Sequence, residues 1–413
     1  MSAVTAVPQP DGRIAPQPWM SEPTTEAVMK ALGAEGGSAR FVGGCVRDVL
    51  LGRAIGDIDI ATPLLPQEVM RRLEAAGIRA VPTGLAHGTV TAVMAPRHFE
   101  VTTLRRDVET FGRHARVEFT DDWAEDARRR DFTMNALFLD PYGTVFDPVH
   151  GLSDLFAGHV RFVGDAATRI REDVLRVLRF YRFHAWLGRG TADAAARAAC
   201  RVSAPLVSTL SGERVQAELM KLLRAADPAA TLALMAEDGV LGKILPATRP
   251  LDILRRLVRL ERSNDLEADA LRRLGAVIAG DAEGVARRLK LSNAERDRLI
   301  ALEGALDLAG DAPALRRLLY RLGRETYIDR ALMTAAQAGA TRKLRGLLAA
   351  AARWRKPVFP LSGGDVTALG LAPGPEIGRL LAALEDWWEE GDFRASRRAC
   401  LAELRRRVLA VVA

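Results

Sequence analysis

The sequence contains few of the residues that form disulfide bonds or bind structural zinc. Its 413 residues include only three cysteines, Cys45, Cys200 and Cys400, which lie far apart without a CxxC pair. This spacing predicts neither a disulfide framework nor a zinc cluster, and it fits a protein of the reducing cytoplasm. All six histidines lie in the first 184 residues, and none is followed by aspartate. A histidine–aspartate phosphohydrolase site is therefore excluded.

Long apolar segments are also missing. No apolar run reaches the length of about 18 residues that a membrane helix needs. The N-terminus lacks a charged segment followed by an apolar core, which is the pattern of an export signal. The sequence therefore predicts a cytoplasmic protein that neither crosses a membrane nor is exported.

Lysine is scarce, but arginine is abundant. Lysine and arginine together number 59 against 52 acids, so the net charge is +7 and the isoelectric point is near 9.7. A basic excess favours an anionic partner, and we place nucleic acid ahead of membrane. Genomic composition can also make arginine abundant. Whether this protein binds nucleic acid therefore has to be judged from where the arginines lie in the sequence.

The length predicts roughly two to four domains. Residues 1–22 carry four prolines without hydrophobic periodicity and are predicted to be a disordered leader. Between residues 23 and 150, short β-rich runs such as DIDIA and GTVTAVM alternate with helical segments, which predicts a mixed sheet with helices. After Gly164, leucine, alanine and arginine recur at spacings of three and four residues, so the remainder is predicted to be helical.

Two acids alternate with isoleucines in the run GDIDIAT. In a strand, Asp57 and Asp59 share one face about 7 Å apart, while Ile58 and Ile60 point into the core. Two carboxylates held so close repel unless a cation lies between them, and Mg²⁺ prefers carboxylate oxygens together with substrate phosphates. Glu100, in the apolar run HFEVTTL, is a candidate third carboxylate. Alternatively, all three acids are solvent-facing residues of ordinary strands.

A glycine pair precedes this strand. Gly43 and Gly44 allow the backbone to approach a bulky ligand, and a helix beginning there would direct amide N–H groups toward phosphate. Arg47 follows one turn later and adds a positive charge. A tight turn before a helix is the simpler interpretation of the glycines alone. Followed by two closely spaced acids, they indicate a triphosphate cradle beside a metal site.

A stripe of charged residues marks the segment IREDVLRVLRFYRF. Asp173, Arg176, Arg179 and Arg182 recur every three residues, so on one helix they form a polar stripe. An amphipathic surface helix with ion pairs from Glu172 and Asp173 to Arg176 is one interpretation. The other is nucleotide recognition. Cytosine and adenine each present an amino donor beside a ring-nitrogen acceptor, so one acid and one arginine can select both. The remaining arginines would meet the triphosphate.

The segment RRRDFTMNALFLD adds a basic cluster before a predicted strand. Arg130 is a candidate phosphate contact. Asp131 and Asn135 are interpreted as residues that cap and fix the turn.

Four motifs together carry a resemblance: GGCVRD with GDIDIAT, RRDFTMNAL, REDVLRVLRFYRF and SGERVQAEL. In this order they resemble class II tRNA nucleotidyltransferases and bacterial poly(A) polymerases of the polymerase β superfamily. The resemblance implies an α+β protein with an N-terminal nucleotidyltransferase mixed β-sheet head, followed by all-α neck, body and tail domains. The implied ranges are 23–150 for the head, 151–225 for the neck, 226–350 for the body and 351–413 for a tail that binds tRNA.

The resemblance also implies roles for individual residues. Asp57 and Asp59 match the metal-binding catalytic pair, and Gly44, Arg47 and Arg130 match triphosphate or nucleotide contacts. Asp173 and Arg176 match the pair that acts as a protein template for the incoming base, with Arg179 and Arg182 on the nucleotide side.

The implied activity is Mg²⁺-dependent addition of C, C and A to the 3′ end of tRNA from CTP and ATP, with tRNA as partner. The segment 107–119 resembles the flexible loop of CCA-adding members. Two alternatives stay open: an enzyme that adds only A, such as a poly(A) polymerase, and a catalytically inactive RNA-binding homologue. The oligomeric state is not predicted.

Overall fold

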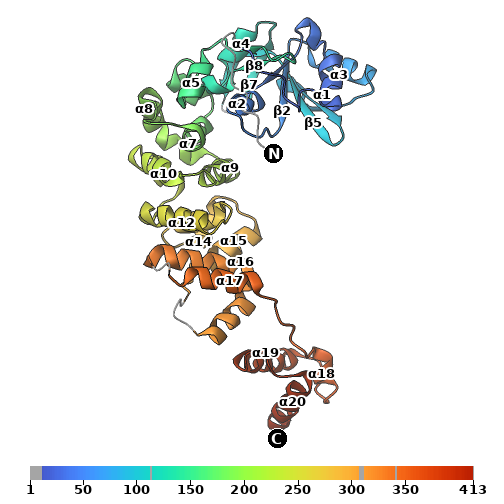
Figure 1. Ribbon diagram of the computed structural model, residues 1–413, viewed down its shortest axis with the longest axis vertical. Coiled ribbons are helices and arrows are strands. Elements are labelled where there is room, and N and C mark those ends of the chain that lie inside the picture. The colour runs from blue at the N-terminus through green and yellow to red at the C-terminus, as the bar shows by residue number, and fades with distance from the viewer. Residues whose placement is uncertain (1–11, 112–113, 307–310, 340–341, 413) are drawn as a thin grey trace. The chain divides into compact units, whose positions relative to one another are not determined.

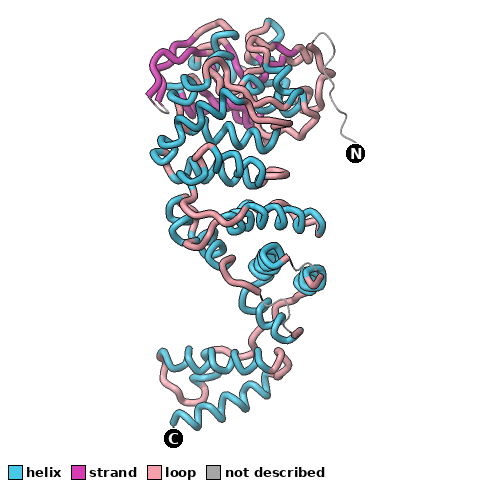
Figure 2. The backbone as a smooth tube through the Cα atoms, turned by 90° about the vertical axis from the view of Figure 1, so that its left-hand side faces the viewer, coloured by secondary structure: helices cyan, strands magenta, loops and turns pink. Residues whose placement is uncertain are grey.

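The computed structural model describes residues 12–111, 114–306, 311–339 and 342–412. The chain forms two compact units, residues 1–246 and residues 247–413. Figure 2 shows that, among the described residues, strands occur in the N-terminal part, while helices and loops make up the rest. This arrangement confirms the predicted α+β fold class.

A seven-stranded mixed sheet forms the centre of the head, in the order β3-β4-β5-β2-β1-β8-β9 (Figure 1). Only β2 and β5 run parallel, and the other pairs are antiparallel. The strand bounds are β1 Arg40–Val42, β2 Ile58–Thr62, β3 Arg79–Gly84, β4 Thr89–Met94, β5 Arg97–Thr103, β8 Phe138–Leu139 and β9 Val145–Phe146. The first five strands coincide with the predicted β-rich runs.

Four helices accompany the sheet: α1 Pro23–Ala31, α2 Gly44–Leu50, α3 Pro66–Ala75 and α4 Trp123–Arg128. Helix α3 packs against β3, β4 and β5, and α2 packs against β1 and β2. Strand β2 shows the expected alternation, because Ile58 and Ile60 are buried while Asp59 between them is only partly buried. The apolar side of this strand therefore anchors the acids.

Residues 112 and 113 of the segment that resembles a flexible loop lie outside the described part, and its other residues between 107 and 119 lie in a pair of antiparallel strands. The hairpin consists of β6 Arg105–Phe111 and β7 His114–Phe119, with Arg105 opposite Phe119 and Phe111 opposite His114. The base of the hairpin packs against the head. Phe119 lies so close to Gly88 that a Cβ atom added at residue 88 would be 2.7 Å from Cε1 of Phe119.

The prediction of a disordered leader is wrong for residues 12–22, and its first eleven residues lie outside the described part. Ile14, Trp19 and Met20 are buried. The backbone N–H of Ile14 donates to the carbonyl of Gly143 at 2.8 Å, so the segment lies against the turn before β9. The prolines disfavour a regular element, but the apolar side chains on either side of Pro16 and Pro18 still enter the core.

The helices that follow the head belong to the same unit: α5 Gly151–Ala157, α6 Ala166–Glu172, α7 Leu175–Leu187, α8 Ala194–Ser203, α9 Gly212–Leu223, α10 Pro228–Glu237 and α11 Leu241–Ile244. Helix α7 packs against α9 and α10. The hydroxyl of Tyr181 donates to Asp238 at 2.8 Å. The predicted boundary at residue 225 therefore lies too early, because α10 and Asp238 complete the packing around α7.

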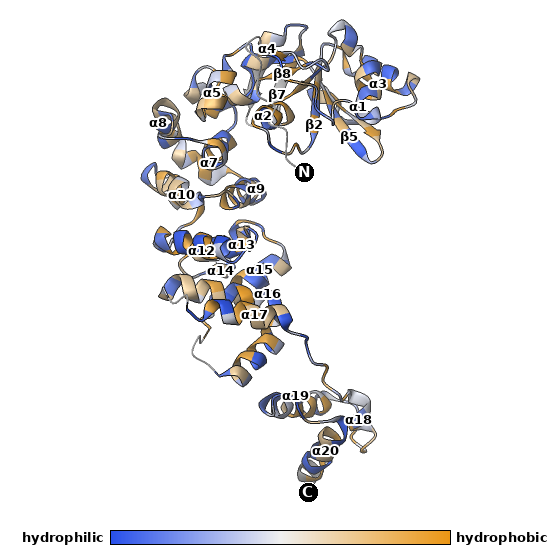
Figure 3. Cartoon of the chain, in the orientation of Figure 1, coloured by the Kyte–Doolittle hydropathy of each residue, from blue (hydrophilic) through white to orange (hydrophobic). Residues whose placement is uncertain are grey.

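The second unit contains only helices among its described residues: α12 Leu251–Ser263, α13 Ala270–Val277, α14 Ala282–Arg288, α15 Asn293–Ala301, α16 Ala312–Ala338, α17 Leu344–Arg353, α18 Gly363–Thr367, α19 Pro375–Glu390 and α20 Arg397–Val412. Figure 3 shows hydrophilic and hydrophobic residues side by side on helices such as α12. The buried Leu254 and Leu257 of α12 face its neighbours, as the spacing of the leucines predicts.

Helix α16 changes direction at Gly323, whose φ of 75° is non-helical. Before this glycine, Tyr320 joins an apolar cluster with Leu384 and Trp388 of α19. After it, the buried Asp329 accepts a hydrogen bond from Arg272 at 2.7 Å. The predicted tail boundary at residue 350 is therefore incomplete, because the first half of α16 packs with the tail.

Candidate active site

The three predicted carboxylates lie together at neighbouring strands of the head. Asp59 on β2 is directly opposite Glu100 on the parallel strand β5. Asp57 precedes β2 by one residue and is exposed, as is Glu100. Paired residues of adjacent strands point to the same face, so the sheet brings Asp59 and Glu100 side by side.

Burial and neighbouring charge both act on Asp59. Burial raises the pKa of Asp59 to about 6, Glu100 and Asp57 add to this rise, and only Arg130 opposes it. The cluster thus concentrates negative charge that the nearby protein groups do not balance. Oxygen donors with excess negative charge suit a hard divalent cation. Among the described residues, however, no group of three or more histidine, cysteine, aspartate or glutamate side chains is close enough to hold a metal by itself.

A glycine turn lies against these acids. Gly43 has φ 75° and ψ −124°, a conformation that glycine adopts most readily, and α2 begins at Gly44. A Cβ atom at residue 43 would lie 3.8 Å from Oδ2 of Asp59 and 3.8 Å from Nη1 of Arg130. The turn therefore lies beside the carboxylate of Asp59 and the guanidinium of Arg130.

A cavity of about 650 Å³ opens beside the turn. Its lining includes eight of the predicted site residues: Gly43, Gly44, Arg47, Asp59, Arg130, Asp173, Arg176 and Arg179. Three other predicted residues, Asp57, Glu100 and Arg182, are not part of this lining. Arg182 instead lines an adjoining cavity of about 360 Å³, which shares Arg47, Phe183 and Lys221 with the first.

A hydrogen-bonded chain crosses the cavity from the head to helix α7. Arg47 donates to Asn135 at 2.8 Å, Asn135 donates to Asp131 at 3.1 Å, and Arg179 donates to Asp131 at 2.7 Å. Burial opposes ionisation of Asp131, but Arg179, Asn135 and the N–H of Phe132 outweigh it and hold the pKa of Asp131 below its usual value. Asp131 and Asn135 therefore link two arginines across the site, in addition to shaping the turn.

The predicted single stripe on one helix is wrong at its first residue. Asp173 lies in extended conformation between α6 and α7, and its carboxylate accepts the N–H of Leu175 at 3.1 Å. Aspartate favours such local bonds over a continuous helix. The other carboxylate oxygen accepts from Arg214 at 2.7 Å. Arg176 begins the stripe on α7.

Arg176 has several fixed partners. It forms an ion pair with Glu172, as the surface-helix interpretation predicts, and donates to the carbonyl oxygen of Arg169 at 2.8 Å. It also donates to the carbonyl oxygen of Arg129 at 3.4 Å. The predicted ion pair with Asp173 is absent from the contacts of the described residues. The two residues still line one cavity, so the ion pair with Glu172 does not remove Arg176 from the site.

Arg130 is held by a buried acid. Asp126, which is 1% exposed, accepts from Arg130 at 2.8 Å and from Arg129 at 2.7 Å. Burial opposes the ionisation of Asp126, but the two arginines prevail and lower its pKa. Burial lowers the pKa of Arg129 to about 10. One carboxylate thus orients two guanidinium groups at the cavity.

Several lining residues were not predicted as site residues: Arg129, Asp131, Asn135, Phe183, Arg214 and Lys221. The first three lie within the segment RRRDFTMN. Arg129 belongs to its basic cluster, and Asp131 and Asn135 were interpreted as residues that cap and fix the turn. Arg214 lies in the motif SGERVQAEL, which contributed to the resemblance. Lys221 had no local signal, because its position depends on the packing of α9 against α7.

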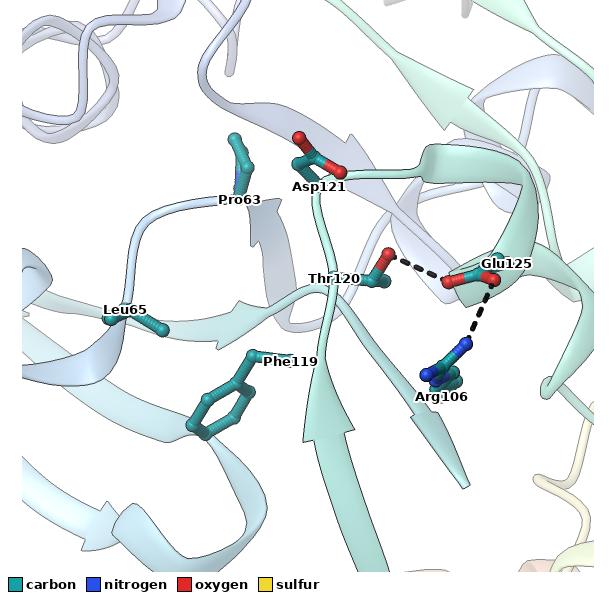
Figure 4. A pocket seen from close by; sticks show the side chains of 7 residues that line it. All are labelled: Pro63, Leu65, Arg106, Phe119, Thr120, Asp121 and Glu125. Atoms are coloured by element: carbon teal, nitrogen blue, oxygen red, sulfur yellow. Dashed lines mark hydrogen bonds and ion pairs between the residues drawn. The ribbon is translucent and has the colours of Figure 1, made fainter. Parts of the chain in front are cut away.

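Another cavity, of about 380 Å³, lies at the base of the β6–β7 hairpin (Figure 4). Glu125 accepts a hydrogen bond from Thr120 at 2.7 Å and forms an ion pair with Arg106 at 3.6 Å. Leu65 and Phe119 lie on its other side and are 51% and 40% exposed. These contacts tie the base of the hairpin to α4 of the head.

Acids on adjacent strands, a glycine turn and a cavity rich in arginine are the features expected of a nucleotidyltransferase. The family model described as the poly A polymerase head domain matches residues 39–161. A second model, described as a probable RNA and SrmB-binding site of polymerase A, matches residues 192–251.

Similar proteins extend this likeness over most of the chain. CCA tRNA nucleotidyltransferase 1, mitochondrial, of Danio rerio is 36% identical over 380 residues, which cover 88% of this chain and 86% of that protein. The CCA-adding enzyme of Geobacillus stearothermophilus is 35% identical over 379 residues, with coverages of 88% and 92%. The chain therefore belongs to the family of CCA-adding tRNA nucleotidyltransferases.

Solved structures agree with this assignment. The CCA-adding enzyme of Bacillus stearothermophilus in complex with CTP matches with a TM-score of 0.73 and 30% identity, covering 94% of this chain and 98% of that one. The Thermotoga maritima CCA-adding enzyme complexed with tRNA matches with a TM-score of 0.61, covering 95% of this chain and 97% of that one. At 20% identity, the second likeness concerns the fold alone.

Proposed function

We propose that the cavity lined by Asp59 and the arginines of α7 is where this enzyme adds C, C and A to the 3′ end of tRNA. It uses CTP and ATP and releases pyrophosphate. The observation that carries this assignment is that one cavity joins the glycine turn, the acid Asp59 and the residues Asp173 and Arg176. The first two suit a triphosphate beside a metal, and the last two suit the edge of a base.

Enzymes of this family use a divalent metal ion, and we assign magnesium to this one. Asp57 and Asp59 would hold it, because their oxygen donors and uncompensated negative charge fit a hard cation. A metal bound there would supply a lowered pKa for the primer 3′-OH and positive charge at the α-phosphate. Glu100, beside Asp59, is proposed to complete the acid cluster.

The chain's own groups position and neutralise the nucleotide. Gly43 and Gly44 let the backbone approach the phosphates, and Arg47, Arg130 and Arg179 supply positive charge around them. Each of these arginines is held by an acid, namely Asp48, Asp126 or Asp131. Little reorganisation is then needed when the nucleotide enters.

Asp173 and Arg176 are proposed to select the base. The N–H of Leu175 and the guanidinium of Arg214 each bind one oxygen of the Asp173 carboxylate, which fixes its orientation. A carboxylate accepts from the amino group that cytosine and adenine share, and a guanidinium donates to the adjacent ring nitrogen. Uracil and guanine present the reverse order and would leave both groups unpaired.

Incubation of the purified protein with tRNAs that end before CCA, after C and after CC tests this function. We expect C to be added to the first two and A to the third, each nucleotide being supplied singly. Incorporation of A alone on all three would identify an A-adding enzyme or a poly(A) polymerase. If the protein binds tRNA but incorporates no nucleotide, it is a catalytically inactive homologue. The intact acid pair argues against this outcome.

The four-part domain scheme and the tail as a tRNA-binding region remain proposals. Many arginines that would serve this role form ion pairs within the second unit. Arg256 pairs with Asp252, Arg316 with Asp392, and Arg407 with Glu403. Binding of tRNA by this unit therefore depends on those arginines that stay exposed.

Location in the cell also stays a prediction. No helix among the described residues is long and apolar enough to cross a membrane. The relatives include proteins named as mitochondrial.

A further inference from the structure

Phe183 lies at the junction between the head and helix α7. It is 4% exposed and lines both the large cavity and the adjoining one. Its ring packs edge-on against Phe132 of the head, with centroids 5.3 Å apart. The ring thus forms part of the wall between the site and the core.

Three arginines surround this ring. The guanidinium carbon of Arg182 lies 3.9 Å from the ring centroid, that of Arg47 lies 5.2 Å away, and that of Arg179 lies 5.5 Å away. All three distances fall within the range of about 6 Å in which the negative face of an aromatic ring attracts a cation. Arg47 comes from α2 of the head, whereas the other two come from α7.

The acid partners of these arginines hold the edges of the guanidinium groups. Arg47 donates to Asp48 at 2.9 and 2.8 Å, Arg179 donates to Asp131, and Arg182 donates to Glu218. Arg47 also donates from its third nitrogen to Asn135 at 2.8 Å. Phe183 adds to each of these guanidinium groups a cation–ring contact that the hydrogen bonds do not supply.

Phe183 also reduces the repulsion among these cations. Burial, only partly offset by Glu218, lowers the pKa of Arg182, and the charge of Arg179 lowers it further. The negative face of a ring partly compensates clustered positive charge without adding an acid that would repel phosphate. An aromatic residue is therefore better suited to this position than an aliphatic residue of similar size.

We propose that Phe183 is a positioning residue for nucleotide binding, whose ring sets the guanidinium groups of Arg47 and Arg179 for the triphosphate. This inference rests on the proposed role of those two arginines. It assigns to the aromatic face of Phe183 an effect on nucleotide affinity that packing alone does not supply. It concerns both nucleotides equally, because CTP and ATP share the triphosphate.

The first test compares two leucine substitutions on α7. Phe183→Leu is expected to raise KM for CTP and for ATP about tenfold, equal to about 1.4 kcal/mol, with little change in kcat. Phe180→Leu is the matched control, because Phe180 is fully buried on the same helix and contacts the rings of Phe162, Tyr181 and His184. We expect the control to lower Tm while KM stays within twofold. An equal rise of KM in both variants would overturn the proposal.

The second test keeps the shape of the side chain, so it can be used even if the Phe183→Leu variant does not fold. Phenylalanines carrying one, two or three fluorine atoms are incorporated at position 183, because fluorine withdraws electron density from the ring face. The logarithm of KM is expected to rise with each fluorine at constant Tm, and the same series at position 180 is expected to leave KM unchanged. A KM at position 183 that is independent of fluorine number would reject the positioning role.

The Arg179→Ala variant distinguishes failure of the proposed nucleotide site from failure of the proposed role of Phe183. It is expected to raise KM for both nucleotides at least tenfold, as the proposed function requires. If Arg179→Ala raises KM while fluorination of Phe183 leaves KM unchanged, the proposed site is supported and the positioning role of Phe183 is rejected. If Arg179→Ala leaves KM unchanged, the proposed nucleotide site is itself wrong and the inference falls with it.

Discussion

Asp59 on β2 lies directly opposite Glu100 on the parallel strand β5, and no other pair of strands in the seven-stranded sheet is parallel. The two acids face the same side because paired residues of adjacent strands do so. Asp57 precedes β2 and adds to the negative charge around Asp59. This arrangement concentrates three acids at one edge of the site.

Removal of either proposed metal ligand is expected to abolish nucleotide addition. Asp57→Asn and Asp59→Asn should each lower the rate at least a thousandfold, because the primer 3′-OH then lacks its activating cation. Binding of tRNA, measured by filter retention, should stay within threefold of wild type. Asp121→Asn, at an exposed aspartate of the head, is the control. Activity within tenfold of wild type in either variant would end this assignment.

Glu100→Gln tests whether the third acid takes part. Because Glu100 pairs with Asp59, we expect the rate of single-nucleotide addition to fall at least a hundredfold. Glu74→Gln, at an exposed acid of α3, should have no effect. An unchanged rate in the Glu100 variant would make this residue an ordinary exposed strand residue.

Arg176→Ala is expected to relax the choice of base. Loss of one charged hydrogen bond costs roughly 1.5–3 kcal/mol, so UTP and GTP should become substrates in a competition assay. The variant also removes the ion pair with Glu172, and circular dichroism therefore has to confirm the fold. Unaltered base choice in a folded variant would refute the template role.

Asp238 is expected to control the stability of the first unit. It is 1% exposed and accepts hydrogen bonds from Tyr181, Arg197 and Arg201. Loss of one partner of such a buried pair costs about 3–5 kcal/mol, so Asp238→Asn should lower the free energy of unfolding by a similar amount at pH 7. Glu237→Gln is the control, because this exposed neighbour pairs with the same Arg197 and should matter by less than about 1 kcal/mol.

The effect of Asp238 should depend on pH. Burial opposes its ionisation, but hydrogen bonds from Arg197, Arg201 and Tyr181 prevail and lower its pKa. The unfolded chain, with a pKa of about 3.9, therefore takes up the proton first as the pH falls. The stabilisation is complete above that value and disappears below it. Urea unfolding of wild type and variant should thus converge as the pH falls below about 4 and through the lowered pKa of the folded state, and a constant difference would contradict this account.

Exposed arginines of the tail are expected to contact the tRNA backbone. Removal of the tail would expose Tyr320 and its apolar cluster, so charge substitutions are the cleaner test. Arg398→Gln with Arg405→Gln should make the plot of log affinity against log salt shallower by up to about two units. Arg79→Gln in the head, also exposed, should leave the slope unchanged. Identical slopes in the wild type, the double tail variant and the Arg79 variant would show that these tail arginines do not contact tRNA, and the arginines of the body would be tested next.

Much of the fold follows from local pattern. The alternation of apolar and polar residues located the first five strands, and the spacing of leucines located the helical remainder. The hairpin β6–β7 and the short strand β9 were not predicted, whereas β8 lies at the end of RRRDFTMNALFLD, where a strand was predicted. The position of β8 in the sheet depends on a partner distant in sequence, because Phe41 of β1 pairs with Leu139. Residues 12–22 show the same dependence, because Trp19 is buried only where Phe41 provides a ring to pack against.

The sequence by itself determined which residues carry charge, that two acids lie close together at one strand, and where glycine permits an unusual turn; Asp57 lies one residue before that strand and Asp59 lies within it. Only the tertiary structure decided that Glu100 lies beside Asp59, since parallel pairing joins strands about forty residues apart. It also decided that Asn135 and Asp131 connect Arg47 to Arg179, and that a single ring contacts arginines of two helices. The physical reason is that hydrogen bonds and cation–ring attraction act within a few ångströms of space, and distance along the chain does not predict distance in the fold.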